Sequence, residues 1–90
     1  MKQAVQLKIK GIVQGVFFRQ SCVDKAHELD ITGWVRNCED GSVELEAEGD
    51  EGLLRVFIQW CSRGPRNAKV SEVEQKDVPL KGHVGFEIKR

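Results

Sequence analysis

A short loop that ends in an arginine is the feature of this sequence best suited to chemistry. Residues 15–19 read GVFFR and run directly into a stretch with apolar residues at helical spacing. Such a loop can turn several backbone N–H groups toward one point, and the helix dipole favours an anion there. The guanidinium of Arg19 adds a permanent positive charge and a planar fork that suits phosphate. The local sequence alone also fits, and favours, a simple turn at Gly15 followed by a solvated Arg19.

Asn37 is the second candidate, and its case depends on where it lies in the fold. It stands three residues before Asp40. The pair Asp40-Gly41 predicts a two-residue type I′ hairpin turn, because glycine readily takes the positive φ that such turns require. Taken alone, Asn37 is better explained as an amide bonded to the backbone near this turn. A role in a site requires the fold to bring Asn37 close to residues 15–19.

Two helices are expected from apolar residues at helical spacing. The first runs from near Arg19 to near Asp30. Its inner face comprises Phe18, Cys22, Ala26 and Leu29. The second begins after a helix cap at Asp50 and is closed by Gly64-Pro65. Its apolar stripe comprises Leu53, Phe57, Trp60 and Cys61.

Alternation of apolar and polar residues predicts the strands, which comprise residues 5–9, 31–38, 43–48 and 70–78 and a short final strand at 84–88. The order of strands and helices is typical of an α+β fold, the ferredoxin-like split βαβ sandwich, βαββαβ plus a short extra strand. Each strand–helix–strand crossover joins parallel strands, and the hairpin joins the second and third strands antiparallel.

The simplest arrangement that meets these demands is an antiparallel sheet of order 4-1-3-2 with two helices on one face. The first and second strands then end at the same edge, about 10 Å apart across the intervening strand. This topology predicts that residues 15–19 lie beside Asn37, so each candidate strengthens the other.

The composition fits a single domain spanning residues 1–90. The chain has 14 Lys or Arg residues against 14 Asp or Glu residues, so no net field would draw it to nucleic acid or a membrane. Its three cysteines are odd in number and widely spaced, which fits buried, reduced thiols in the cytosol better than disulfides. The first eleven residues lack the apolar run of a signal peptide. We therefore expect a cytoplasmic protein, with a monomer as the default.

Other residues that could carry chemistry have structural explanations. No arginine lies six residues after any of the three cysteines, so a Cys-x5-Arg phosphatase motif is missing. The Cys and His spacings match no zinc site, and no Gly-x4-Gly-Lys-Ser/Thr loop for a nucleotide occurs. No metal or cofactor is therefore expected. Surface positions are expected for His27 and His83, a solvated strand face for Glu44, Glu46 and Glu48, and core or interface positions for Trp34 and Trp60.

Two segments resemble the signatures of the acylphosphatase family. Residues 11–19, GIVQGVFFR, are similar to the first signature, and residues 33–37, GWVRN, are similar to the second. The GDEG stretch at residues 49–52 and Gly64-Pro65 also look like that family. The similarity covers nearly the whole chain and shows no departure at the catalytic positions. It implies hydrolysis of acyl phosphates to a carboxylate and inorganic phosphate.

The resemblance also implies how the site divides its work. Arg19 and Asn37 would be the catalytic residues, with Arg19 holding the phosphate and Asn37 orienting the attacking water. The phosphate would also be bound by the backbone of Gly15, Val16, Phe17, Phe18 and Arg19. No side chain offers itself as a strong base beside Asn37, so the substrate's own phosphate is the candidate acceptor of the water proton.

Two alternative functions share this topology. RNA-recognition modules carry base-stacking aromatic residues on their central strands. Here the first strand carries Val5, Leu7 and Ile9 instead, so RNA binding is a poor fit. The second alternative is a non-catalytic or accessory acylphosphatase-like binding module, such as the one fused to hydrogenase-maturation carbamoyltransferases. A chain of 90 residues with both motifs intact favours the independent enzyme.

Overall fold

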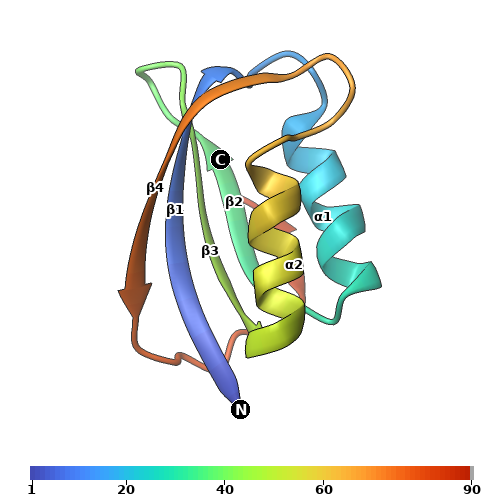
Figure 1. The fold of residues 1–90 in the computed structure, drawn as a ribbon, viewed down its shortest axis with the longest axis vertical. Coiled ribbons are helices and arrows are strands. Elements are labelled where there is room, and N and C mark those ends of the chain that lie inside the picture. Colours follow the sequence, from blue (N-terminus) through green and yellow to red (C-terminus); the bar gives the residue numbers. More distant parts are fainter. Residues whose placement is uncertain (90) are drawn as a thin grey trace.

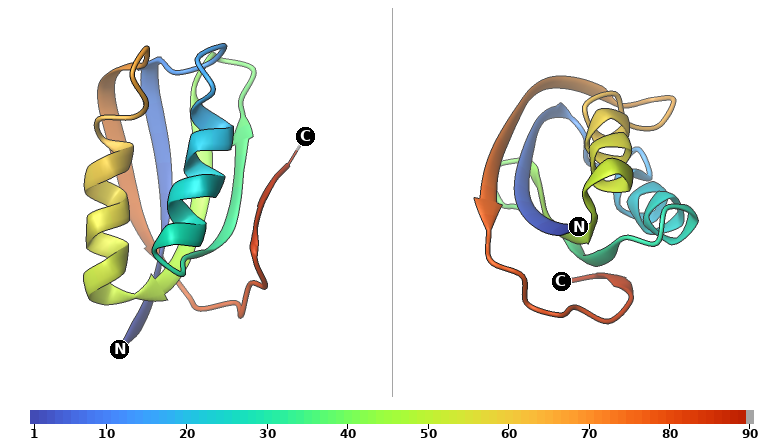
Figure 2. Two further views of the ribbon diagram at one scale, coloured as in Figure 1. Left: turned by 90° about the vertical axis from the view of Figure 1, so that its right-hand side faces the viewer. Right: turned by 60° about the horizontal axis from the view of Figure 1, so that its bottom comes forward.

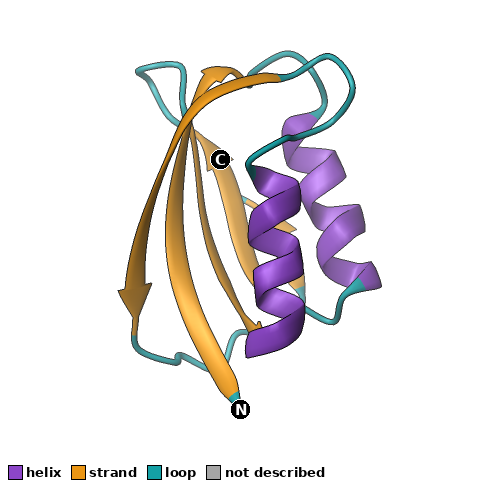
Figure 3. Cartoon of the chain, in the orientation of Figure 1, coloured by secondary structure: helices purple, strands orange, loops and turns teal. Residues whose placement is uncertain are grey.

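The computed structural model describes residues 1–89, which form a five-stranded sheet with two helices packed on one face (Figures 1 and 3). The predicted order of elements is confirmed, with small shifts at their ends. In chain order the elements are β1 (Lys2–Ile12), α1 (Phe18–Glu28), β2 (Thr32–Asn37), β3 (Val43–Asp50), α2 (Glu51–Cys61), β4 (Lys69–Val78) and β5 (Phe86–Ile88). Neither helix in this described part of the chain has the length and hydropathy that crossing a membrane requires.

The sheet has the order β4-β1-β3-β2-β5, which confirms the predicted 4-1-3-2 arrangement of the first four strands. β3 pairs antiparallel with both β1 and β2, and β4 pairs antiparallel with β1. The antiparallel pairing predicted for these four strands is confirmed, and the extra strand β5, whose direction was not predicted, pairs parallel with β2 and makes the sheet mixed. β4 ends at the same end of the sheet at which β2 begins. Residues 79–85, the crossover segment, pass from there to the opposite edge of the sheet, so that β5 runs in the same direction as β2 (Figure 2).

The core lies between the sheet and the helices. The helices bury six residues there: Phe18, Cys22, Ala26, Leu54, Phe57 and Cys61. The predicted stripe of α2 is wrong in one member, because Leu53 is 41% exposed and Leu54 is buried in its place. Asp50 caps this helix, as predicted, by accepting a hydrogen bond from the N–H of Gly52 at 3.0 Å. The helix therefore starts at Glu51, and the face that packs on the sheet carries Leu54, Phe57 and Cys61.

The cysteines are free thiols, but they are not all buried as expected. Cys22 and Cys61 lie in the core, whereas Cys38 is half-buried in the β2–β3 turn. Burial, followed by the contact with Cys22, raises the pKa of Cys61 well above its ordinary value. Both thiols are fully buried members of the core, and the raised pKa of Cys61 favours its protonated form.

The outer face of β3 contradicts the expectation of a solvated glutamate stripe. Glu46 and Glu48 are only 3% and 5% exposed, because the crossover segment covers them. Glu48 accepts hydrogen bonds from the N–H groups of Lys81 and Gly82 at 2.7 and 3.1 Å. Glu46 lies 3.0 Å from Lys81 Nζ and 2.6 Å from Nε2 of His83, which is half-buried rather than on the open surface. Burial opposes the charge on Glu46, but the bonds from His83 and Lys81 outweigh it and lower its pKa.

The two tryptophans take different places. Trp60 packs beside the core as expected, with its ring 5.8 Å from that of Phe18 and 6.3 Å from that of Phe57. Trp34 is half-buried on β2, away from the helices, and Nζ of Lys89 lies 4.5 Å from its ring. Trp34 therefore supports the sheet through a cation–π contact rather than by filling the core.

Candidate active site

The loop before α1 and the β2–β3 hairpin lie at the same end of the sheet, as the topology predicts (Figures 1 and 2). Both β1 and β2 run toward this end, because each pairs antiparallel with β3. Gln14 connects the two segments directly. Its side-chain amide donates hydrogen bonds to the backbone carbonyls of Cys38 and Ser42 at 2.8 and 2.9 Å. The residues 15–19 and Asn37 are thereby held on neighbouring segments.

The loop of residues 15–19 leaves several backbone N–H groups without protein partners. The first bonded N–H of α1 is that of Ser21, which donates to the carbonyl of Phe17 at 3.0 Å. Within the described chain, the N–H groups of residues 15–20 donate no hydrogen bond to protein, and no side chain caps the helix. The first turn of α1 also carries no acidic residue. Unsatisfied N–H groups at a helix N-terminus form a favourable place for an anion.

The backbone of this loop is held in an unusual conformation. Gly15 has φ 75° and Phe17 has φ 62°, both in the left-handed region. A Cβ added at Gly15 would meet nothing within 4 Å, so the φ angle, and not lack of space, calls for glycine there. Phe17 has no such freedom, and its conformation costs about 1–2 kcal/mol. Strain of this kind occurs at sites where the backbone geometry serves function.

Arg19 lies in the first turn of α1, beside these N–H groups. It is half-buried, and its side chain forms no ion pair or hydrogen bond with residues 1–89. Arg36 differs, because its Nε and Nη2 both bond to Glu44, at 2.9 and 2.6 Å. The guanidinium of Arg36 also lies 5.7 Å from the ring of Trp34. The protein neutralises Arg36 and leaves the charge of Arg19 available to a ligand.

Asn37 is the last residue of β2, where it pairs with Val43 across the mouth of the hairpin. It is exposed, and its side chain makes no hydrogen bond with any residue that the structure describes. The alternative explanation, an amide bonded to the nearby turn, does not match this geometry. The Asn37 amide is free to bind a molecule at the end of the sheet.

The hairpin turn differs from the predicted two-residue type I′ turn. The N–H of Cys38 donates to Ser42 at 2.8 Å, and the N–H of Gly41 donates to Cys38 at 3.2 Å. The loop therefore has three residues, and Gly41, with φ 91°, takes the left-handed place at its end. Asp40 holds the turn by accepting bonds from the N–H and the hydroxyl of Ser42 at 3.0 and 2.6 Å. Nζ of Lys8 lies 3.1 Å from the other oxygen of Asp40.

The charge of Asp40 should make the stability of this turn depend on pH. The bonds from Ser42, followed by the contact with Lys8, hold the pKa of Asp40 well below its ordinary value of 3.8. A depressed folded-state pKa contributes stability above the unfolded pKa and loses it as pH falls toward the folded pKa. We expect Asp40→Asn to lower the urea midpoint at pH 7, and the gap to wild type to close below about pH 4. Glu39→Gln, on the same turn, is the control. A gap that stays constant between pH 7 and pH 2 would contradict a role of the charge.

Gln14 and Lys8 are the residues at this site that the sequence interpretation did not single out. Gln14 lies inside the first motif, and its signal is a polar side chain placed between the end of a strand and Gly15. Lys8 alternates with apolar residues on β1 and looks like any solvated strand residue. Their partners lie on the distant hairpin, so only the fold reveals their contacts.

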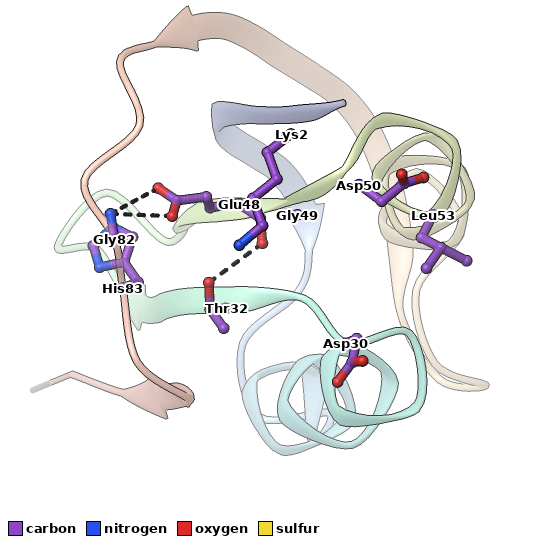
Figure 4. A pocket seen from close by; sticks show the side chains of 9 residues that line it. All are labelled: Lys2, Asp30, Thr32, Glu48, Gly49, Asp50, Leu53, Gly82 and His83. Atoms are coloured by element: carbon purple, nitrogen blue, oxygen red, sulfur yellow. Dashed lines mark hydrogen bonds between the residues drawn. The ribbon is translucent and has the colours of Figure 1, made fainter.

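A cavity of about 490 Å³ lies at the other end of the sheet, between the start of β2, the end of β3 and the crossover segment (Figure 4). Two of its polar residues are bonded within the lining: Glu48 accepts from the N–H of Gly82, and the hydroxyl of Thr32 donates to the backbone carbonyl of Glu48 at 3.3 Å. Among residues 1–89, no group of three or more His, Cys, Asp or Glu side chains is placed to hold a metal ion. The N–H groups of residues 15–20 and the guanidinium of Arg19 lie at the opposite end of the sheet from this cavity.

Comparison with known proteins gives a consistent result. The family model described as Acylphosphatase matches residues 5–88. An acylphosphatase of Pseudomonas paraeruginosa is 49% identical over 82 residues, which are 91% of this chain and 90% of that protein. The crystal structure of acylphosphatase from Bacillus subtilis matches with a TM-score of 0.94 and 34% identity, and covers 100% of both chains. Full-length HypF, in a phosphate- and nucleotide-bound form, matches with a TM-score of 0.89 and 29% identity, but only 12% of that chain is covered.

The family match includes the loop before α1 and the end of β2, which carry the two candidate residues. The likeness to the Bacillus subtilis structure extends over the whole sheet and both helices. Sequence, fold and the placement of the unpartnered groups therefore agree, and the chain belongs to the acylphosphatase family.

Proposed function

We propose that the loop of residues 15–19 binds the phosphoryl group of an acyl phosphate and that Asn37 positions the water that hydrolyses it. Family membership supports the reaction. The roles of the residues are supported chiefly by one observation: the N–H groups of residues 15–20 and the guanidinium of Arg19 have no partners within residues 1–89. Phosphoryl oxygens can accept hydrogen bonds from both kinds of donor.

The reaction needs few catalytic side chains. The water oxygen forms a bond to phosphorus, the bond from phosphorus to the acyl oxygen breaks, and a carboxylate leaves. A carboxylate is a good leaving group and requires no general acid. Phosphoryl transfer then depends mainly on positioning and on stabilising the charge of the equatorial oxygens. Asn37 has no carboxylate or imidazole bonded to it in the described chain. The proton of the water therefore passes to a phosphoryl oxygen of the substrate.

The test is an assay with benzoyl phosphate in the presence of a metal chelator. We expect steady hydrolysis without added metal, because Arg19 and the backbone N–H groups supply the hydrogen bonds and the positive charge that bind the phosphoryl group. Inorganic phosphate should inhibit competitively, since product and substrate present the same group to the loop. Loss of activity on chelation with recovery on adding Mg²⁺ or Zn²⁺ would contradict the proposal. Purely noncompetitive inhibition would place the phosphate elsewhere.

An accessory binding module is the second candidate, and the likeness to a small part of HypF favours it. Such a module would bind phosphate without turning over benzoyl phosphate. The same assay therefore separates the two functions.

We further propose that the protein acts as a cytoplasmic monomer without a nucleic-acid or membrane partner. The balanced charge of 14 basic against 14 acidic residues supports this, as do the free thiols. Light scattering should give a mass near 10.2 kDa. A dimer mass would contradict the monomer.

A further inference from the structure

We propose that Gln14 is a positioning residue for the hydrolysis, because its side chain sets the place of Asn37 relative to the phosphate-binding loop. This inference rests on the proposed function of that site. Gln14 directly precedes Gly15, the first residue of the loop. Its amide bonds to the carbonyl of Cys38, which directly follows Asn37. One side chain thus joins the two halves of the site.

The geometry of the Gln14 amide suits this task. Nε2 lies 2.8 Å from the carbonyl oxygen of Cys38 and 2.9 Å from that of Ser42, so both amide hydrogens have an acceptor on the hairpin. Cys38 follows Asn37 in the chain. Ser42 precedes Val43, the cross-strand partner of Asn37. The amide therefore bonds to both sides of the hairpin, at the residues next to the cross-strand pair of Asn37 and Val43. Gln14 is half-buried, which limits the competition of water for these bonds.

The shape of the turn itself does not require Gln14. The bonds from Cys38 to Ser42 at 2.8 Å and from Gly41 to Cys38 at 3.2 Å already close it. Asp40 adds two bonds to Ser42 within the turn. Among residues 1–89, the two Gln14 bonds are the hydrogen bonds that tie this turn to the loop before α1. What Gln14 contributes is the placement of one segment against the other.

Loss of this link should affect the two functions of the site differently. Arg19 and the N–H groups bind phosphate from α1 and its preceding loop, so phosphate affinity should persist. Asn37 would lose its fixed position relative to them. A displacement of about 1 Å in a reacting group can lower the rate on the order of a hundredfold. A reduced kcat with a retained inhibition constant for phosphate is therefore the signature of a positioning role.

Gln14→Met removes both donors while keeping the length of the side chain. Gln14→Glu is the second variant, and it turns an acceptor toward the two carbonyls. For each we would measure kcat on benzoyl phosphate, the inhibition constant of inorganic phosphate and the urea midpoint. We expect kcat per folded molecule to fall about tenfold or more and the inhibition constant to stay within about twofold.

Thr32→Val is the matched control. It removes a side-chain hydrogen bond to a backbone carbonyl, that of Glu48 at 3.3 Å, at the other end of the β2–β3 pair. We expect it to leave kcat unchanged.

A double-mutant cycle tests whether Gln14 acts through Asn37. In the Asn37→Ala background, Gln14→Met should change kcat by less than about twofold, because the group that it positions is gone. The same loss in both backgrounds would overturn the proposal. So would a Gln14→Met variant with a lower urea midpoint and a normal kcat. Failure of the proposed function looks different: an inactive wild type, or an Asn37→Ala variant with a normal kcat, would overturn both proposals.

Discussion

Replacing Arg19 with lysine is expected to remove nearly all activity from a protein that still folds. Lysine keeps the positive charge but lacks the planar fork that donates two parallel hydrogen bonds to a phosphoryl group. Loss of one such donor from a preorganised site costs on the order of a hundredfold or more in rate. Folding should persist, because the Arg19 side chain makes no ion pair or hydrogen bond with residues 1–89. The measurement is kcat/KM for benzoyl phosphate, together with the urea midpoint of the same preparation.

Arg36→Lys is the control for this variant. Arg36 lies next to Asn37 in the sequence, but its guanidinium is already bonded to Glu44. We therefore expect Arg36→Lys to keep its activity. If Arg19→Lys also kept most of its activity, Arg19 would not be the phosphate ligand.

Asn37→Ala should separate the positioning of water from the binding of phosphate. The amide of Asn37 is exposed and has no partner within residues 1–89, so its removal takes away a ligand group and not a structural bond. We expect kcat to fall on the order of a hundredfold, or about 2.7 kcal/mol of barrier. The inhibition constant of phosphate should stay near the wild-type value, because Arg19 and the N–H groups supply the binding.

The same preparation distinguishes the other possible roles of Asn37. If Asn37 only supported the turn, its loss would lower the urea midpoint by an amount worth about 1 kcal/mol or less and leave kcat per folded molecule unchanged. Loss of phosphate inhibition together with activity would make Asn37 part of the phosphate site.

The order of elements could be predicted because local patterns decide it. Alternation in Val5, Leu7 and Ile9 marks β1, and the helical spacing of Phe18, Cys22 and Ala26 marks α1. The connections between strands then leave few topologies open, which is why the sheet order and the meeting of the two site segments could be predicted. The shared edge of β1 and β2 follows from topology alone.

What could not be predicted depends on contacts between segments far apart in the chain. Glu46 and Glu48 have the sequence pattern of a solvated strand face, and their burial is caused by a crossover segment more than thirty residues later. The parallel direction of β5 depends on the path of the same segment. The bonds from Gln14 to Cys38 and to Ser42 likewise span sequence separations of 24 and 28 residues. Sequence periodicity carries no signal for such contacts.

The pairing of β5 with β2 has a consequence for self-association. Without β5, the outer edge of β2 would present unpaired N–H and C=O groups, and an open strand edge is a template for pairing with another molecule. β5 covers this edge by pairing Gly33, Trp34 and Val35 with Phe86, Glu87 and Ile88. The contacts of Glu46 and Glu48 with the crossover segment fasten this cover from the middle of the sheet. We therefore expect these two buried carboxylates, which lie away from the proposed phosphate site, to help protect the protein against aggregation.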